Sequence, residues 1–164
     1  PRRFGHLDII PAGGEAEHPL LSHLGIEPLS NHLSGPWLSD VLRGKKTPIK
    51  SALLDQRLIA GLGNIYVNEA LHMSGVSPRR LAQTIAGKRA EKLVIAIRTV
   101  LAAAIEAGGT SLRDHVQPGG EIGYFVQRLS VYGRTSEPCL TCATPIKELR
   151  QSGRASFYCP SCQR

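Results

Sequence analysis

The sequence predicts a mainly α-helical domain followed by a small β-hairpin module at its carboxyl end. Apolar residues recur at three- and four-residue spacing through much of residues 19–133, and glycines or prolines stand where these segments begin and end. Beyond Gly133 the pattern changes to short β-like segments, and all four cysteines of the chain lie there. We therefore divide the chain into residues 1–18, a helical domain 19–133 and a cysteine-containing module 134–164.

Four helices are expected in the helical domain. Ser34, Thr47 and Asn64 each stand where a side chain can accept a hydrogen bond from the free amides of a first helical turn. The expected helices cover 34–42 with Pro36 in the first turn, a segment that opens at 48, a segment from 64 to about 74, and 87–107. Gly108 and Gly109 stop the last helix, whose expected apolar positions are Leu93, Ile97, Val100, Leu101, Ala104 and Ile105.

Two segments lack helical periodicity. Residues 3–10 are compatible with a short strand, and the glycines and prolines of 11–19 indicate a linker. Residues 112–122 contain Pro118 followed by two glycines, which predicts a mobile loop.

Composition bounds the class of protein. Hydrophobic residues make up 41% of the 164 residues, which is compatible with a folded core. Lys and Arg outnumber Asp and Glu by 20 to 13, and this excess favours a polyanionic partner, because neutralising phosphates releases counterions. A merely solvated basic surface is the alternative. No apolar run approaches the roughly 18 residues of a membrane span, and no secretory signal is recognisable, so we expect a soluble intracellular protein.

The four cysteines form two CxxC pairs, Cys139 with Cys142 and Cys159 with Cys162. A CxxC on a tight turn aims two sulfurs at one point, and a second pair on the opposite hairpin arm completes the tetrahedron that Zn²⁺ prefers. A redox CxxC needs only one pair in a βαβ setting, which is absent from this pattern. The sequence therefore predicts one structural zinc ion with no position left open for water.

Two further features suit phosphate. Gly153 and Arg154 fall between the cysteine pairs, where a hairpin tip would push the guanidinium outward. Gly61 and Gly63 directly precede the helix expected at Asn64, where free amides and the helix dipole attract anions. Each feature alone is equally compatible with an ordinary solvated turn or cap. The lysine and hydroxyl residue of a nucleotide-binding P-loop do not follow these glycines.

Taken together, these motifs resemble the formamidopyrimidine-DNA glycosylase family, to which endonuclease VIII is related. The matching segments are 1–5 (PRRFG), 61–70 (GLGNIYVNEA), 123–125 (GYF), 131–134 (VYGR), 153–154 (GR) and 159–162 (CPSC). They occur in the family's order and span nearly the whole chain.

This resemblance implies a helix–two-turn–helix DNA-binding domain and a zinc finger. It implies that Lys50, Asn64 and Tyr66 lie near the phosphates beside a damaged nucleotide, and that Arg154 grips the same backbone. The implied partner is damaged double-stranded DNA carrying an oxidised purine or an abasic site, and the implied setting is the nucleoid in the bacterial cytoplasm, with a protein that is monomeric when complete.

The resemblance also implies residues that contact the lesion. Arg2 and Phe4 match a loop that fills the gap left by a flipped-out nucleotide, which favours the formamidopyrimidine branch. The loop that begins at Thr110 matches the segment that covers an oxidised purine, with candidate contacts Arg113, Asp114 and His115. A merely flexible surface loop is the alternative.

The chemistry of the family is not expected in this chain. Family members begin with Pro-Glu, and the proline amine attacks the sugar, whereas Pro1 is followed by Arg2 and matches an interior segment of the family's first domain. The six histidines are scattered and form no convincing acid–base pair. We therefore expect a non-catalytic DNA-binding part of a bifunctional glycosylase and lyase. A zinc-ribbon scaffold that binds protein is the alternative.

Overall fold

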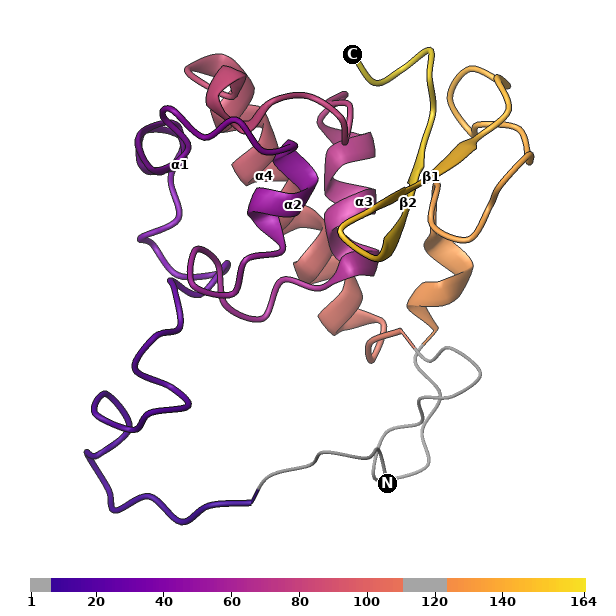
Figure 1. Cartoon of the computed structure of the whole chain (residues 1–164). Helices are drawn as coiled ribbons and strands as arrows, with labels where there is room; N and C mark the ends of the chain where they lie inside the picture. Colours follow the sequence, from indigo (N-terminus) through magenta and orange to yellow (C-terminus); the bar gives the residue numbers. More distant parts are fainter. Residues whose placement is uncertain (1–6, 111–123) are drawn as a thin grey trace.

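The computed structural model describes residues 7–110 and 124–164 (Figure 1). A block of helices fills one side of the described molecule, and a two-stranded hairpin packs against it on the other side. The elements are α1 (Gly35–Val41), α2 (Ile49–Leu53), α3 (Asn64–Met73), η1 (Ala82–Thr84), α4 (Lys88–Glu106), η2 (Phe125–Arg128), β1 (Lys147–Gln151) and β2 (Arg154–Tyr158). The mainly helical fold with a carboxyl-terminal hairpin is as the sequence predicts.

The starts of α1 and α2 show how the chain caps its helices. The Ser34 hydroxyl accepts a hydrogen bond from the Trp37 amide at 3.3 Å, which confirms the predicted cap. The prediction for Thr47 is wrong, because Pro48 occupies the cap position of α2 with extended backbone. The Thr47 carbonyl instead accepts a hydrogen bond from the Ala82 amide, and Pro48 pairs with Leu81 in a short antiparallel bridge.

Helix α3 begins one residue earlier than a cap at Asn64 requires. Gly63 is the cap residue, with extended backbone, and Asn64 is the first helical residue, so the predicted capping role of Asn64 is wrong. The Asn64 side chain turns toward the hairpin, where its amide donates to the Ala155 carbonyl at 3.2 Å. The helix ends before Ser74 and Gly75, as the sequence predicts.

Helix α4 is the centre of the helical core. It packs against both α1 and α3, and its described bounds match the predicted segment 87–107. The predicted apolar positions are buried except Ile105, whose side chain is 65% exposed. Successive helical residues point about 100° apart, so Ile105 leaves the apolar face that Ala104 still occupies.

The hairpin forms as predicted, with Gln151 opposite Arg154 at its tip and Lys147 opposite Tyr158 at its base. Ser152 and Gly153 between the strands both have positive φ, 48° and 75°, which is the geometry of a two-residue type I′ turn. The small core beneath the hairpin contains Val131, Ile146 and Phe157, and the Tyr132 ring contacts Phe157 edge-on at 4.9 Å.

The predicted non-helical segments are only partly described. Residues 7–10 carry no strand in the part of the chain that the structure describes, and residues 3–6 lie outside it. The predicted loop 112–122 also lies outside them, although Thr110 and Tyr124 on either side pair in an antiparallel bridge. No helix in residues 7–110 and 124–164 is long and apolar enough to cross a membrane.

Candidate nucleic-acid interface and metal centre

A hollow of about 260 Å³ brings the glycine loop and the hairpin tip together. We call it the glycine-loop hollow; its lining residues are Leu54, Gln56, Gly61, Leu62, Gly63 and Arg154. The loop precedes α3 and Arg154 begins β2, so two segments far apart in the sequence meet at one place. The sequence suggested each as a phosphate site separately, and the fold places them side by side.

The glycine loop is held in a fixed shape. The Gly61 amide donates to the Gln56 side-chain oxygen at 2.7 Å, and the Gln56 amide group donates to the Leu54 and Leu62 carbonyls, each at 3.2 Å. Gly61 has φ +77°, a conformation that glycine adopts without strain. An added Cβ at Gly61 or Gly63 would meet no atom within 4 Å, so the loop borders open space. Gln56 is a bracing residue that sequence reasoning missed.

The first turn of α3 presents unpaired donors. Within the described residues, the amides of Asn64, Ile65 and Tyr66 make no hydrogen bond, and the first one used is that of Val67 to the Gly63 carbonyl. Such amides and the positive end of the helix dipole attract anions. The glycine-loop hollow adjoins this helix end at Gly63, so an anion there would lie near the amino end of α3 and near Arg154.

Lys50 holds the hairpin rather than facing solvent. Its side chain is fully buried, and Nζ donates to the Ala155 carbonyl at 2.6 Å and to the Ser156 hydroxyl at 2.7 Å. Asn64 donates to the same carbonyl, and the Ser51 and Ser152 hydroxyls lie 3.1 Å apart at the tip. These contacts tie α2 and α3 to the strand that carries Arg154.

The environment of Lys50 disfavours its charge. Burial, and secondarily the positive charge of Arg154, lower the pKa of Lys50 from 10.5 to about 8. Between pH 8 and 10.5 the unfolded chain keeps this proton while the folded chain has lost it. The free energy of unfolding therefore rises with pH across this window.

We expect this rise to disappear in Lys50→Met. Unfolding in urea can be measured for both zinc-loaded proteins from pH 7.5 to 10.5. Over this range the free energy of unfolding of the wild type should rise by about 3 kcal/mol relative to that of the variant. The thiols titrate in both proteins, so their contribution cancels in the difference. A difference that stays constant with pH would show that Lys50 keeps an ordinary pKa in its buried position.

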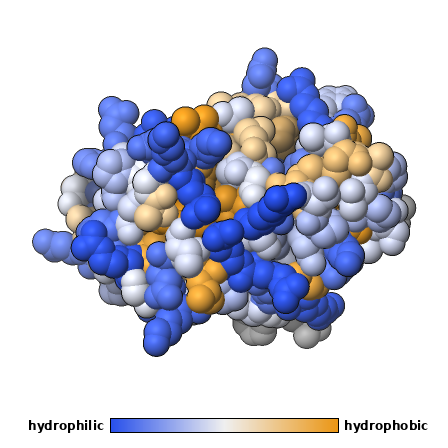
Figure 2. Space-filling model, turned by 90° about the horizontal axis from the view of Figure 1, so that it is seen from above, coloured by the Kyte–Doolittle hydropathy of each residue, from blue (hydrophilic) through white to orange (hydrophobic). Residues whose placement is uncertain are grey.

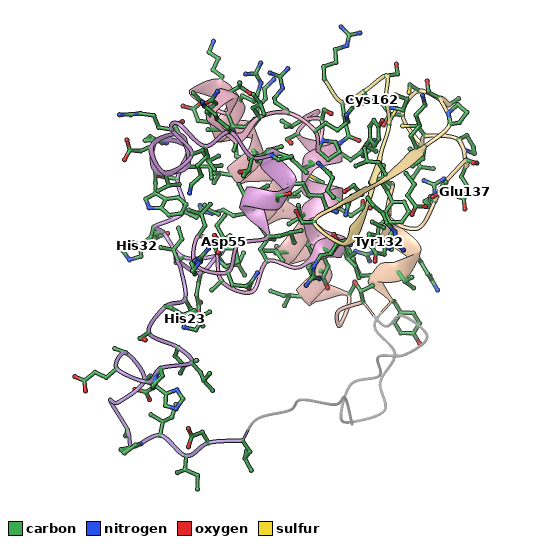
Figure 3. The ribbon with its side chains drawn as sticks, in the orientation of Figure 1. His23, His32, Asp55, Tyr132, Glu137 and Cys162 are labelled. Atoms are coloured by element: carbon green, nitrogen blue, oxygen red, sulfur yellow. The ribbon has the colours of Figure 1, made fainter. Side chains whose placement is uncertain are left out.

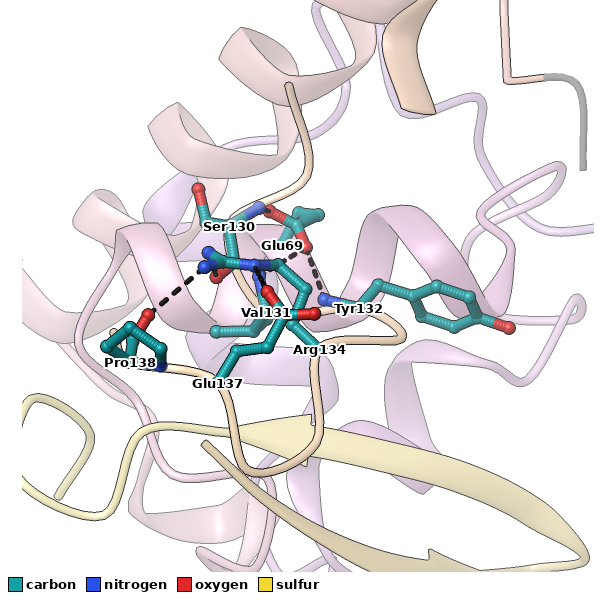
Figure 4. Close-up of polar contacts among 7 residues, drawn as sticks. All are labelled: Glu69, Ser130, Val131, Tyr132, Arg134, Glu137 and Pro138. Carbon is teal, nitrogen blue, oxygen red and sulfur yellow. Dashed lines mark hydrogen bonds and ion pairs between the residues drawn. The ribbon is translucent and has the colours of Figure 1, made fainter. Parts of the chain in front are cut away.

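Two buried polar residues of α3, Asn68 and Glu69, lie within the matching segment 61–70, and the sequence alone predicts no role for them. The Asn68 side chain accepts a hydrogen bond from the Phe157 amide at 2.8 Å and donates to the Asn64 carbonyl at 2.7 Å. Glu69 is 5% exposed, and its carboxylate accepts the amides of Ser130, Val131 and Tyr132 at 2.8 to 3.0 Å (Figure 4). Their position among the apolar residues of this helix is the sequence signal that could have revealed a structural role.

Arg134 fixes the same connection from the other side. Its guanidinium donates to the Ser130 and Pro138 carbonyls and to the Glu137 carboxylate, at 2.8 to 3.1 Å (Figure 4). Together with Glu69, it sets the path of the chain between the helical domain and the cysteine module.

Tyr66 lies between Thr110 and Phe125, which stand on either side of residues 111–123 in the sequence. Its hydroxyl is 3.1 Å from the Thr110 hydroxyl, and its ring contacts Phe125 edge-on at 5.8 Å. The other predicted lesion contacts, Arg2, Phe4, Arg113, Asp114 and His115, lie outside the described residues.

The four predicted metal ligands converge. The sulfurs of Cys139, Cys142, Cys159 and Cys162 all lie within 4.8 Å of one another, and the closest pairs are 3.3 to 3.4 Å apart. Zn–S bonds of about 2.3 Å in a tetrahedron place sulfurs about 3.8 Å apart, which this spacing brackets. Hydrogen bonds from the Thr144 side chain and amide lower the pKa of the Cys142 thiol, whereas the neighbouring Cys142 sulfur raises the pKa of the Cys162 thiol. The donor set fits zinc.

The four histidines that the structure describes do not form a common site. His23 and His32 lie on the side of the molecule opposite Cys162 (Figure 3), and the His18 Nε2 pairs with the Asp8 carboxylate at 2.8 Å. Among these four, His72 lies at the metal centre, with Nε2 3.6 Å from the Cys139 sulfur. Burial lowers the pKa of His72, and the nearby Glu69 carboxylate opposes this shift.

Comparison with known proteins agrees with this architecture. The family model of the formamidopyrimidine-DNA glycosylase H2TH domain matches residues 24–116, and that of a zinc finger found in FPG and IleRS matches residues 136–164. A formamidopyrimidine-DNA glycosylase of Beijerinckia indica is 55% identical over 100% of this chain and 60% of that protein, and one of Cereibacter sphaeroides is 53% identical over 99% and 58%. The chain thus spans about 60% of the length of the curated relatives it matches.

Solved structures give the same result. The MutM (Fpg) protein of Thermus thermophilus superposes with a TM-score of 0.85 at 44% identity, covering 92% of this chain and 57% of that one. Lactococcus lactis Fpg in complex with abasic-site DNA superposes with a TM-score of 0.80 at 34% identity, covering 88% and 53%. Because the H2TH model covers more than half of the chain, the chain belongs to the formamidopyrimidine-DNA glycosylase family.

Proposed function

We propose that this chain binds the backbone of damaged duplex DNA in base-excision repair, as the DNA-binding part of a DNA glycosylase and AP lyase. The observation that carries the proposal is the glycine-loop hollow, where Arg154 and the amino end of α3 face one space. An arginine fork and a row of free amides are the groups that bind phosphate oxygens. Relatives of known structure contain DNA with an abasic site or a Fapy-dG lesion.

The roles of the other predicted residues follow from their positions. Asn64 directly follows Gly63 of the hollow and can turn its amide from Ala155 to a phosphate. Lys50 acts as a positioning residue, because its contacts with Ala155 and Ser156 hold the strand that carries Arg154. Tyr66 links the hollow to Thr110, where the lesion-covering loop would begin.

Contacts with the lesion itself are part of the same proposal. Arg2 and Phe4 would fill the space left by an extruded oxidised purine, since extrusion costs a few kcal/mol that an inserted side chain offsets in part. Arg113, Asp114 and His115 would contact the extruded base. We propose a monomer in the bacterial cytoplasm, at the nucleoid.

We further propose that this chain does not itself cleave the base or the strand. Pro1 is followed by Arg2, and the carboxylate that would activate an amine nucleophile is absent from that position. The cysteine cluster supports one zinc ion with a structural role, because four thiolates fill a tetrahedral shell and leave no position for a reacting water. Glycosylase and lyase chemistry would then belong to the longer proteins of the family.

Arg154→Ala should weaken DNA binding about tenfold and reduce its salt dependence. Removal of one phosphate contact lowers the slope of log Kobs against log salt concentration by about one unit. Fluorescence anisotropy with a duplex carrying an abasic-site analogue, over a series of salt concentrations, measures both quantities for the zinc-loaded protein.

Arg150→Ala is the matched control. Arg150 lies on the same hairpin opposite Ala155, so its side chain points to the other face from Arg154. Arg150→Ala should keep the wild-type slope of log Kobs against log salt concentration. Equal slopes for wild type and Arg154→Ala would contradict the assignment of Arg154, and binding insensitive to salt would favour a protein-binding scaffold.

A further inference from the structure

A second hollow, of about 680 Å³, lies where the helical domain meets the cysteine module. We call it the basic hollow; four cations line it, Arg79, Arg80, Lys147 and Arg164, together with Tyr158. No aspartate or glutamate is among its lining residues. Its lining therefore differs from that of an ordinary solvated surface, where charges of both signs alternate.

Backbone contacts between the two modules fix the shape of the basic hollow. The Arg164 amide donates to the Gly75 carbonyl at 3.0 Å, and the Ser77 amide donates back to the Arg164 carbonyl at 3.2 Å. The buried Gln163 side chain donates to the Val76 carbonyl at 2.9 Å, and Arg80 Nε donates to the Arg164 carbonyl at 3.1 Å. The cations therefore stand on a scaffold that is already ordered.

Three of the cations are available for a ligand. Arg79, Lys147 and Arg164 are exposed, and within residues 7–110 and 124–164 none of their side chains pairs with a carboxylate. Figure 2 views the molecule from the side on which the chain ends in Figure 1, and hydrophilic side chains crowd that face. Uncompensated positive charge on a fixed surface attracts polyanions.

The basic hollow is separate from the glycine-loop hollow. The two share no lining residue, and they lie at opposite ends of α3, since Gly63 precedes the helix and Ser77 follows it. A ten-residue helix is about 15 Å long, which is more than the spacing of adjacent phosphates on one strand. One phosphate cannot occupy both hollows.

We propose that the basic hollow is a second binding site for the phosphodiester backbone of nucleic acid. Arginine forks match phosphate oxygens, and the half-buried Tyr158 adds a hydroxyl donor and an aromatic face beside them. The backbone comes either from a distant stretch of the duplex held in the glycine-loop hollow or from a second duplex. The chemistry at the basic hollow is the same in both cases.

The test uses the double variant Arg79→Glu/Lys147→Glu, whose two side chains are exposed and make no hydrogen bond in the described residues. Lys88→Glu/Lys92→Glu, on α4, makes the same change of charge outside the basic hollow. Zinc-loaded protein is first saturated with an abasic-site duplex of about 12 base pairs, roughly one helical turn. A labelled undamaged duplex of the same length is then titrated, and native mass spectrometry counts the duplexes per protein.

If a second duplex is the source, wild type and the α4 control bind two duplexes, and the double variant binds the second at least tenfold more weakly. If the source is the same duplex, each protein binds one duplex. A duplex of about 24 base pairs then gives a steeper slope of log Kobs against log salt concentration than the short duplex does. The double variant removes that difference. In both cases the first short duplex binds the double variant within about twofold of the control.

Three results would overturn the proposal. The first is a double variant that matches the α4 control in every arm, and the second is a wild type that shows neither a second duplex nor any effect of duplex length. The third is displacement of the nucleic acid from the basic hollow by poly-glutamate as effectively as by inorganic polyphosphate, which would assign this hollow to an acidic protein instead. Failure of the first duplex to bind wild type would instead contradict the proposed function, so the two failures are distinguishable.

Discussion

Removal of the metal should unfold residues 134–164 and leave the helices folded. The cysteine module has a small core, in which Ile146 and Phe157 pack against Val131 of the preceding segment, and its four thiols stand close enough to repel one another once ionised. Metal binding in such modules supplies on the order of 10 kcal/mol of folding free energy. The helical core around α4 contains no cysteine, so its stability should not depend on metal binding.

Chelation followed by two spectroscopic signals measures this effect. The near-ultraviolet signal of the Tyr132–Phe157 contact should disappear, whereas the far-ultraviolet helical signal should change little. Binding to abasic-site DNA should fall by at least about 100-fold, because Arg154 loses its fixed place beside the glycine loop. Restoring zinc should restore all three signals, and a metal-free protein that keeps the Tyr132–Phe157 signal would show that the module folds without metal.

The sequence predicts those features of the chain that depend on local chemistry. The Ser34 cap, the stop of α4 at two glycines, the turn at Gly153 and the four metal ligands each require particular residue types within a few positions. Because each depends on neighbouring residues, none of these features requires knowledge of the rest of the fold. The convergence of the sulfurs follows because both CxxC pairs lie at the ends of one hairpin.

The errors occur where a distant segment competes with a local one. Thr47 is a suitable cap by type, but the segment at Leu81 and Ala82 pairs with its backbone. Asn64 is likewise a suitable cap, but the Ala155 carbonyl, 91 residues away, takes its side-chain amide. The sequence predicts that Lys50 lies near a phosphate, and only the fold reveals that its side chain is buried against the hairpin, where we propose a positioning role. Partners so distant in sequence leave no periodic signal.

Glu69→Ala should destabilise the folded protein by about 3–5 kcal/mol. The carboxylate is buried, and it is the acceptor for three consecutive backbone amides, Ser130, Val131 and Tyr132. Alanine would leave these donors without an acceptor, and each unsatisfied buried donor costs about 1–3 kcal/mol. Part of this cost is relieved if water enters the space that the side chain vacates.

Glu69→Gln separates the charge from the hydrogen bonds. The Val131 and Tyr132 amides share one carboxylate oxygen, which a glutamine oxygen can replace, but the glutamine NH₂ then faces the Ser130 amide, donor against donor. We expect a loss of about 1–3 kcal/mol, smaller than for alanine. Urea unfolding of the zinc-loaded proteins measures both values, with the exposed Glu106→Ala on α4 as a control that should stay within about 0.5 kcal/mol of wild type.

The position of the lost stability can be measured as well. Hydrogen exchange should speed up first at the Ser130, Val131 and Tyr132 amides in Glu69→Ala, because these amides exchange when the connection between the two modules opens. Binding to abasic-site DNA should weaken in the same variant although Glu69 lies outside the glycine-loop hollow, since a loosened connection no longer holds the hairpin tip beside Gly63. A Glu69→Ala protein with wild-type stability and wild-type exchange at these amides would show that Arg134 alone fixes the connection.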